Sequence, residues 1–320
     1  MIKVGILGAQ TTAAGELIRI LINHPEVEIR SLYSPSFAGR PVSSRHHGLL
    51  GEKIVNFSDK LNPEELDILF ITDEIPEGEN IIKSMDKWED LRIIDLTHSD
   101  LSQRLANGFE YGLSEINRKT LVRGTKKAVI PSSEASLSLI GIAPLAFYLM
   151  LPQEINISIA APKEVVEKFE NEKITKEIFR QLNKIQKSFN GKINFEITPN
   201  KSRRVMRVKA NFKCPLAIEE IEKIYESYYD DHNFVFTSLS EVEGKEVEGT
   251  HKTIVTFTKP EPDMIEIEIV GDCRLRGGAG DAVHVLNLFF ALYEKIGLQL
   301  KPSRYGESQE STSRPPSWFG

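Results

Sequence analysis

The stretch that decides the fold opens the chain and reads M-I-K-V-G-I-L-G-A-Q-T-T-A-A-G-E-L-I-R-I-L (1–21). Ile2 to Leu7 is a short aliphatic run that ends at Gly8. From Ala13 onward, large apolar residues recur at helical spacing. A strand, a glycine turn and a helix in this order predict the first unit of a doubly wound, nucleotide-binding α/β sheet.

The turn itself departs from a dinucleotide fingerprint. Such a turn needs glycine where the backbone approaches the pyrophosphate, and this chain has Thr11, Thr12 and Ala14 there. We expect Gly8, Gln10, Thr11 and Thr12 to be the residues that meet a nucleotide.

Composition sets the class of protein. The chain has 320 residues, which is enough for two domains, and a formal charge of −6, which argues against nucleic-acid binding. Its two cysteines, Cys214 and Cys273, exclude a disulfide framework and a cysteine-rich metal site, and we expect no metal. The longest apolar run is too short to span a bilayer, and the first residues already read as a strand rather than a signal peptide. We therefore expect a soluble, cytoplasmic protein without membrane contact.

The end of the second strand bears on cofactor choice. Val27 to Tyr33 reads as a strand, and its carboxyl end would face the adenosine ribose. Ser34, Ser36 and Arg40 follow it, and such donors suit a 2′-phosphate, as in NADP. The alternative is a polar surface turn.

Alternating strands and helices continue to a second candidate position. Compact apolar runs at 66–72, 91–96 and 127–130 predict buried strands, with a helix at 78–87. Pro131 to Ser136 then opens an apolar helix that runs to Tyr148. The free N–H groups at a helix start can bind an anion, so Ser133 is a candidate nucleophile; the alternative is a helix cap.

The second half has a different pattern. Residues 163–189 predict one long amphipathic helix, and 216–229 predict another. Period-two alternation predicts strands at 155–159, 193–197, 205–212, 234–237, 253–257 and 264–270, so we expect an α+β domain on an antiparallel or mixed sheet. A glycine-rich loop (270–281) leads into a helix at 282–296, and residues 304–320 predict a flexible tail.

Four stretches together resemble the N-acetyl-γ-glutamyl-phosphate reductase family of the aspartate-semialdehyde dehydrogenase superfamily. They are G-E-L-I-R-I-L-I-N-H-P-E-V-E-I (15–29), I-D-L-T (94–97), Y-G-L-S-E-I-N-R (111–118) and R-L-R-G-G-A-G-D-A-V-H-V-L-N-L (274–288). The resemblance implies a Rossmann domain of residues 1–132 and 278–303. It also implies a glyceraldehyde-3-phosphate dehydrogenase-like α+β domain, residues 133–277, that carries the substrate site and a dimer or tetramer interface.

The chemistry that the resemblance implies needs a cysteine thiolate, a histidine, NADPH and basic side chains that hold an acidic substrate. Ser133 stands at the position of the cysteine, and a serine hydroxyl is hardly ionised near neutrality. Glu134 adds negative charge where a phosphate would approach. The segment that corresponds to the histidine motif, 169–178, contains no histidine, and we expect His98 and His284 to be structural.

The cofactor side also departs from the family. Its glycine finger keeps Gly5 and Gly8, but Thr11 replaces the third glycine, and a β-branched residue disfavours positive φ. The resemblance places the loop with Gly277 and Gly280 beside the cofactor, where Asp281 would add negative charge. We therefore expect NADP binding to be weak or lost.

Three hypotheses follow. In the first and favoured one, the chain is a catalytically degenerate member of the family that binds a nucleotide or an acidic metabolite weakly, or assembles with an active relative. In the second, it is a working NADPH-dependent acyl-phosphate reductase with altered chemistry. In the third, Cys273 in the glycine-rich loop has become the nucleophile.

Overall fold

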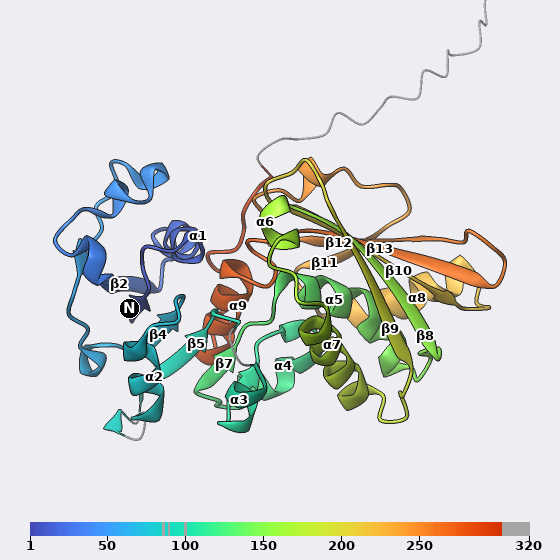
Figure 1. Ribbon diagram of the computed structural model, residues 1–320, viewed down its shortest axis with the longest axis horizontal. Helices are drawn as coiled ribbons and strands as arrows, with labels where there is room; N and C mark the ends of the chain where they lie inside the picture. The colour runs from blue at the N-terminus through green and yellow to red at the C-terminus, as the bar shows by residue number, and fades with distance from the viewer. Residues whose placement is uncertain (85–86, 89, 99–100, 303–320) are drawn as a thin grey trace, which may run out of the picture.

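The computed structural model describes residues 1–84, 87–88, 90–98 and 101–302, and Figure 1 shows them as two domains side by side. The first domain has a seven-stranded sheet of order β3-β2-β1-β4-β5-β7-β6, in which every neighbouring pair is parallel. The second has a six-stranded sheet of order β11-β12-β13-β10-β8-β9 with two parallel and three antiparallel pairs, which is a mixed sheet.

The elements of the first domain follow each other in alternation. Its strands are β1 (Ile2–Leu7), β2 (Val27–Tyr33), β3 (Phe57–Ser58), β4 (Ile68–Ile71), β5 (Arg92–Asp95), β6 (Glu110–Tyr111) and β7 (Lys127–Val129). Its helices are α1 (Thr12–Leu21), α2 (Pro76–Lys83), α3 (Leu101–Ala106) and α4 (Ser114–Val122).

The second half of the chain forms the mixed sheet and the helices before, between and after its strands. Its strands are β8 (Glu154–Ala161), β9 (Lys192–Pro199), β10 (Val205–Lys213), β11 (Val235–Ser238), β12 (Thr253–Thr258) and β13 (Met264–Asp272). The helices of this half of the chain are α5 (Ser133–Phe147), α6 (Lys163–Val166), α7 (Asn171–Ile185), α8 (Ile218–Tyr229) and α9 (Ala279–Phe289).

The predicted doubly wound sheet is confirmed. β1 lies between β2 and β4, and its residues from Val4 to Leu7 are buried, as expected for a parallel strand covered on both faces. Strand order reverses at β1, so the carboxyl ends of β1 and β4 open the crevice in which doubly wound folds bind ligands.

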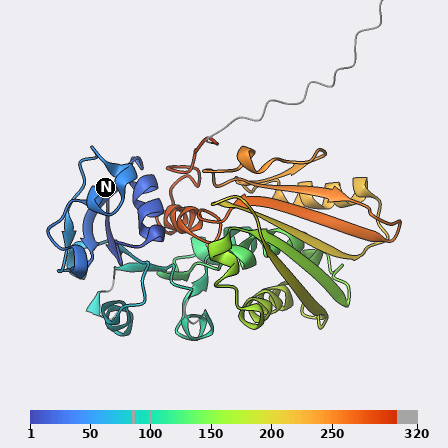
Figure 2. The ribbon, with the colours of Figure 1, turned by 45° about the horizontal axis from the view of Figure 1, so that its top comes forward.

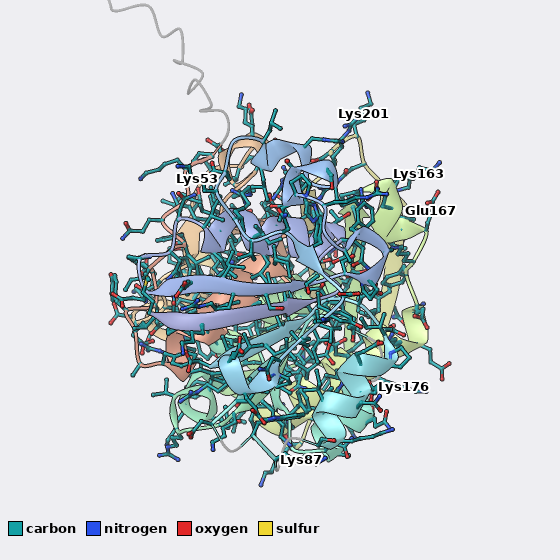
Figure 3. All side chains as sticks on the ribbon, turned by 90° about the vertical axis from the view of Figure 1, so that its left-hand side faces the viewer. Lys53, Lys87, Lys163, Glu167, Lys176 and Lys201 are labelled. Atoms are coloured by element: carbon teal, nitrogen blue, oxygen red, sulfur yellow. The ribbon has the colours of Figure 1, made fainter. Side chains whose placement is uncertain are left out.

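The predicted helix over 163–189 is two helices in the structure. α6 ends at Val166 and α7 begins at Asn171, because Phe169 turns inward and its ring packs 6.0 Å from that of Phe195 on β9. The polar face of each helix is solvated as expected. Lys163 and Lys176 are 79% and 73% exposed and extend outward from the surface (Figure 3).

The last helix differs from the prediction at both ends. It starts at Ala279, and it ends at Phe289, shortly before Ala291 takes a positive φ of 53°. α9 packs against α1 and α4 and lies between the two sheets (Figures 1 and 2), so the chain returns to the first domain after completing the second. The predicted tail, 304–320, lies outside the described residues. In the described part of the chain, no helix is long and apolar enough to cross a membrane.

Candidate functional site

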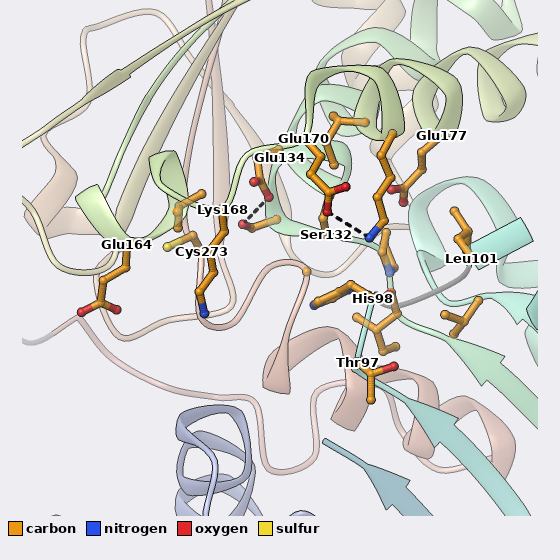
Figure 4. A pocket seen from close by; sticks show the side chains of 18 of the residues that line it. Thr97, His98, Leu101, Ser132, Glu134, Glu164, Lys168, Glu170, Glu177 and Cys273 are labelled. Atoms are coloured by element: carbon orange, nitrogen blue, oxygen red, sulfur yellow. Dashed lines mark hydrogen bonds and ion pairs between the residues drawn. The ribbon is translucent and has the colours of Figure 1, made fainter. Parts of the chain in front are cut away.

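A cleft of about 460 Å³ lies where the two domains meet (Figure 4). Its lining comes from the segments that follow β5 and β7, the start of α5, helices α6 and α7, and the loop after β13. The carboxyl ends of two parallel strands and a helix N-terminus therefore meet the second domain here. This is the edge at which ligands bind in doubly wound folds.

Ser133, the predicted nucleophile position, lies in this cleft as the first residue of α5. The helix is capped by Ser132, whose Oγ accepts the N–H of Ala135 at 3.2 Å. Ser133 is only 8% exposed, and its hydroxyl donates to Glu134 Oε2 at 3.0 Å. The hydroxyl is thus hydrogen-bonded to a carboxyl group rather than to an imidazole.

Gly277, predicted to contact a cofactor, holds the loop against the start of α5. Its φ is +69°, and a Cβ at this position would overlap the backbone N and Cα of Ser133. Only glycine allows both this conformation and this approach. The loop and the first turn of α5 are therefore in direct backbone contact.

A second buried carboxyl group lies beside Glu134. Glu177 on α7 is 7% exposed and accepts the hydroxyl of the buried Tyr111 at 2.8 Å. Burial, helped by the charge of Glu134, raises the pKa of Glu177 to about 7 against the pull of its hydrogen bonds. Burial also raises the pKa of Glu134. Both carboxyl groups therefore ionise at a higher pH than exposed glutamates do, and Glu177 does so only near neutrality.

Charge in the whole cleft is predominantly negative. Among the described residues that line it, two ammonium groups, those of Lys168 and Lys173, face five carboxyl groups. The five are Glu74, Glu134, Glu164, Glu170 and Glu177. Lys173 is drawn toward Glu170 at 3.5 Å, so a dianionic ligand would find little uncompensated positive charge.

His98 is the functional candidate that sequence reasoning missed. It follows β5 with a φ of +56°, an uncommon conformation for a residue other than glycine, and it lines the cleft. Its Nδ1 lies 3.1 Å from the carbonyl of Ile130. Because a carbonyl only accepts, Nδ1 carries the proton, and burial lowers the pKa so that the ring is neutral. Its place at the carboxyl end of a parallel strand was the available signal.

Cys273, the alternative nucleophile, also lines the cleft. Burial and the charges of Asp272 and Glu134 raise the pKa of its thiol to about 12. A reactive cysteine needs a thiolate near neutral pH. The environment of Cys273 therefore disfavours the chemistry that the third hypothesis requires.

The turn after β1 keeps the shape of a nucleotide-binding turn. Gly8 has a φ of +82° and packs against Asp73, so a side chain here would be excluded. Thr11 has an ordinary φ of −72° and caps α1, its Oγ1 accepting the N–H of Ala14 at 3.1 Å. The conflict expected between the β-branched side chain of Thr11 and a positive φ does not arise, because Thr11 adopts a negative φ.

Gln10 and Thr12 occupy different surroundings. The side-chain amide of Gln10 donates to Asp73 at 2.7 Å, which places a carboxylate beside the turn. Thr12 lines a groove of about 170 Å³ between the start of α1 and the loop of Gly277. This groove shares His98, Cys273 and Gly277 with the cleft, so the two adjoin, and we call the pair, from the start of α1 to Ser133, the path.

The residues predicted to select NADP lie after β2. Ser34 is fully buried, and among the described residues its Oγ has no hydrogen-bond partner. Ser36 and Arg40 are exposed, and the Arg40 guanidinium lies 5.7 Å from the ring centre of Phe37. Their contact with a 2′-phosphate stays a prediction.

Gly280 and its neighbour lie away from the groove, inside the first turn of α9. A Cβ on Gly280 would overlap the ring of the buried His251. Asp281 is 1% exposed, accepts the N–H of Gly277 at 2.6 Å and pairs with the buried Arg276 at 3.1 Å. Its charge is compensated inside the protein, so the expected repulsion of a cofactor by Asp281 was wrong.

The parallel sheet, the turn after β1 and the interdomain cleft together define a class of protein. Residues 3–123 match the family model described as semialdehyde dehydrogenase, NAD binding domain. Aspartate semialdehyde dehydrogenase II from Vibrio cholerae superposes with a TM-score of 0.68 over 92% of this chain and 99% of that one, at 12% identity. The Candida albicans enzyme, solved with NADP, gives 0.68 over 92% and 99%, at 13% identity. The chain therefore has the two-domain semialdehyde dehydrogenase fold.

Sequence relatives narrow the class. The N-acetyl-gamma-glutamyl-phosphate reductase of Phocaeicola vulgatus is 32% identical over 95% of this chain and 100% of its own length. That of Bacteroides fragilis is 33% identical over 95% and 100%. The chain belongs to the N-acetyl-gamma-glutamyl-phosphate reductase family, and the predicted family and fold class are confirmed.

Proposed function

We propose that this chain is a nucleotide-binding member of its family that no longer reduces an acyl phosphate. The observation that carries the proposal is the hydrogen bond from the Ser133 hydroxyl to Glu134, in a cleft where carboxyl groups outnumber ammonium groups. Reduction through a thioester needs a thiolate, and a hydroxyl held by an adjacent carboxyl group is a poor substitute.

The carboxyl groups around Ser133 support the proposal that the chain no longer reduces an acyl phosphate. A dianionic phosphate that approached Ser133 would meet Glu134 and Glu177, both buried. Once these carboxyl groups ionise, they repel the phosphate strongly because they are buried, and the transition state gains negative charge as the acyl phosphate is attacked. Cys273 gives no replacement, since its thiol has a pKa of about 12.

The nucleotide half supports retained binding. A bound nicotinamide nucleotide would supply hydride chemistry, and the residues present fit one: Gly8 in its left-handed conformation, the capped start of α1 and the adjoining groove. The buried, unpartnered Oγ of Ser34 offers a donor at the end of β2. We expect weaker affinity than in active relatives, because the carboxylate of Asp73 lies beside the turn.

An acidic metabolite is the proposed second ligand. Lys168 and Lys173 line the cleft and would hold its carboxylate. Its binding should weaken as the pH rises through about 7, because Glu177 then ionises. A homo-oligomeric state and a cytoplasmic location stay predictions.

His98 favours one alternative, a reductase with altered chemistry. A neutral imidazole that lines both the groove and the cleft has the properties of a general base. In this alternative His98 would accept the proton of Ser133 once a substrate had displaced Glu134.

Two measurements on purified protein test the proposal. NADPH is titrated by fluorescence, and the reaction is assayed in reverse with the semialdehyde, NADP and phosphate. We expect saturable NADPH binding and no turnover above the protein-free blank. Turnover at the rate of an active relative assayed in parallel would refute the loss of chemistry. If His98→Gln abolished that turnover, the alternative would replace the proposal.

A further inference from the structure

A cluster of arginines lies at the α1 end of the path. Glu16 on α1 accepts two hydrogen bonds from Arg204, which precedes β10, and is paired with Arg19 at 3.1 Å. Burial alone would raise the pKa of Glu16, but these arginines hold it below its ordinary value. The carboxylate of Glu16 is therefore already compensated.

Arg274 is the third arginine beside Glu16, and it is loosely held. Its Nη1 lies 3.8 Å from Glu16 Oε1, and in the described part of the chain its guanidinium makes no other ion pair. Its backbone, in contrast, is fixed. The N–H donates to Asp272 at 2.9 Å, and the carbonyl accepts from Ala279 at 3.1 Å. The side chain is thus anchored at its base and available at its tip.

The position of Arg274 shows which ligand site its guanidinium group can serve. Its side chain is 30% exposed and lines the same groove as Thr12 and Ala13, which lie in the first turn of α1. Three guanidinium groups in this cluster face two carboxylates, those of Glu16 and Asp272, so the cluster carries a net positive charge. An anion in the groove would meet both the positive end of the helix and Arg274.

We propose that Arg274 binds a phosphoryl group in this groove, exchanging its long contact with Glu16 for a bidentate contact with phosphate oxygens. Glu16 keeps its bond with Arg204 during the exchange, so no carboxylate is left unpaired. Planar guanidinium groups suit this two-point contact better than an ammonium group does. The inference rests on the proposed nucleotide function where the phosphoryl group belongs to NADPH, and a free phosphate would use the same contact.

The test compares the full chain with Arg274→Gln and Arg274→Lys. Arg30→Gln is the matched control, because it removes the same charge from an exposed arginine that is paired with Glu28 on β2. NADPH and adenosine are titrated by fluorescence or calorimetry. Inorganic phosphate is tested by thermal shift against chloride at equal ionic strength. The unfolding temperature without ligand shows that each variant folds.

We expect Arg274→Gln to weaken NADPH binding by about tenfold, the effect of one charged hydrogen-bonding partner. Arg274→Lys should retain part of the affinity, and adenosine and Arg30→Gln should show no change. Equal NADPH and phosphate responses in Arg274→Gln and the unchanged chain would overturn the inference alone. If phosphate stabilises the unchanged chain but not Arg274→Gln, while NADPH does not bind, Arg274 holds a free phosphate and the nucleotide function fails. Absence of any ligand response in the unchanged chain would overturn both.

Discussion

The start of α1 and the start of α5 form the two ends of one path, and they differ in charge. Each is a helix N-terminus after a parallel strand, a position suited to anions. Around α1, arginines outnumber the carboxylates that they face. Around α5, Glu134 and Glu177 are buried beside the helix start. The same type of helix start thus lies near a cluster of arginines at one end and beside buried carboxyl groups at the other.

The difference indicates which part of an ancestral site can persist without the reaction. The turn at Gly8 is a backbone feature that also closes the packing of β1 against β4, so the fold itself requires it. The reacting end depends on single side chains such as Ser133, whose replacement leaves the fold intact. Fold and chemistry can therefore separate within one site.

The largest expected effect concerns Ser133, at the start of α5. Ser133→Cys should leave turnover at least about 10³-fold below that of an active relative, because the new thiol would be buried beside Glu134 and disfavoured as a thiolate. The assay is the reverse reaction, accompanied by the pH dependence of alkylation of the new thiol. Family-like turnover in this single variant would remove the contrast between the two ends.

The second prediction concerns the buried carboxyl group of Glu177. Its pKa is raised from 4.5 to about 7 in the folded state. Its contribution to stability is therefore complete below pH 4.5 and is lost as the pH rises through 7. Glu177→Gln keeps an acceptor for Tyr111 without a charge, and should stabilise the protein at pH 8 by about 3 kcal/mol and little at pH 4.5.

Urea unfolding at pH values from 4.5 to 8 measures this effect. Glu172→Gln is the control, because this residue lies in the first turn of the same helix with its side chain 83% exposed. It should show no gain that grows with pH. A gain of equal size in both variants would mean that the helix, rather than burial, causes the effect.

The smallest expected effect concerns the turn after β1, where the nucleotide would bind. Asp73→Asn removes the carboxylate beside the Gly8 turn and keeps an oxygen that can accept from Gln10. NADPH affinity should rise about two- to fivefold at low salt, with the gain shrinking as salt is added. Glu64→Gln, in the short turn before β4, serves as the charge control. Unchanged affinity in Asp73→Asn would exclude Asp73 as the cause of weak binding.

Local patterns predicted most of the fold. The bounds of β1 and β2 agree with the structure residue for residue, because Gly8 ends the apolar run of β1 and Pro25 and Pro35 flank β2. Ser132 is a helix cap, which is the alternative that the segment 131–136 leaves open in the sequence. The break between α6 and α7 was not predictable, because it depends on the distant partner of Phe169 on β9.

The site was predictable only where it depends on backbone. Ser133 and Gly277 were selected from sequence, and the structure brings them into contact. His98 was not selected, although it follows the predicted strand at 91–96, because nothing local shows that the chain turns there with a positive φ. The pairing of Glu16 with Arg204 joins residues 188 positions apart and gives no local signal.

The return of α9 to the first domain has a consequence for how the protein is made. Apolar residues of α9, such as Val283 and Leu286, share one buried cluster with Leu17 and Ile18 of α1. The ribosome makes α1 long before α9, so part of the apolar surface of the first domain stays open until α9 has been made. The second domain, whose strands are contiguous in sequence, can fold earlier. The order of synthesis and the order of folding are therefore reversed for the nucleotide-binding half.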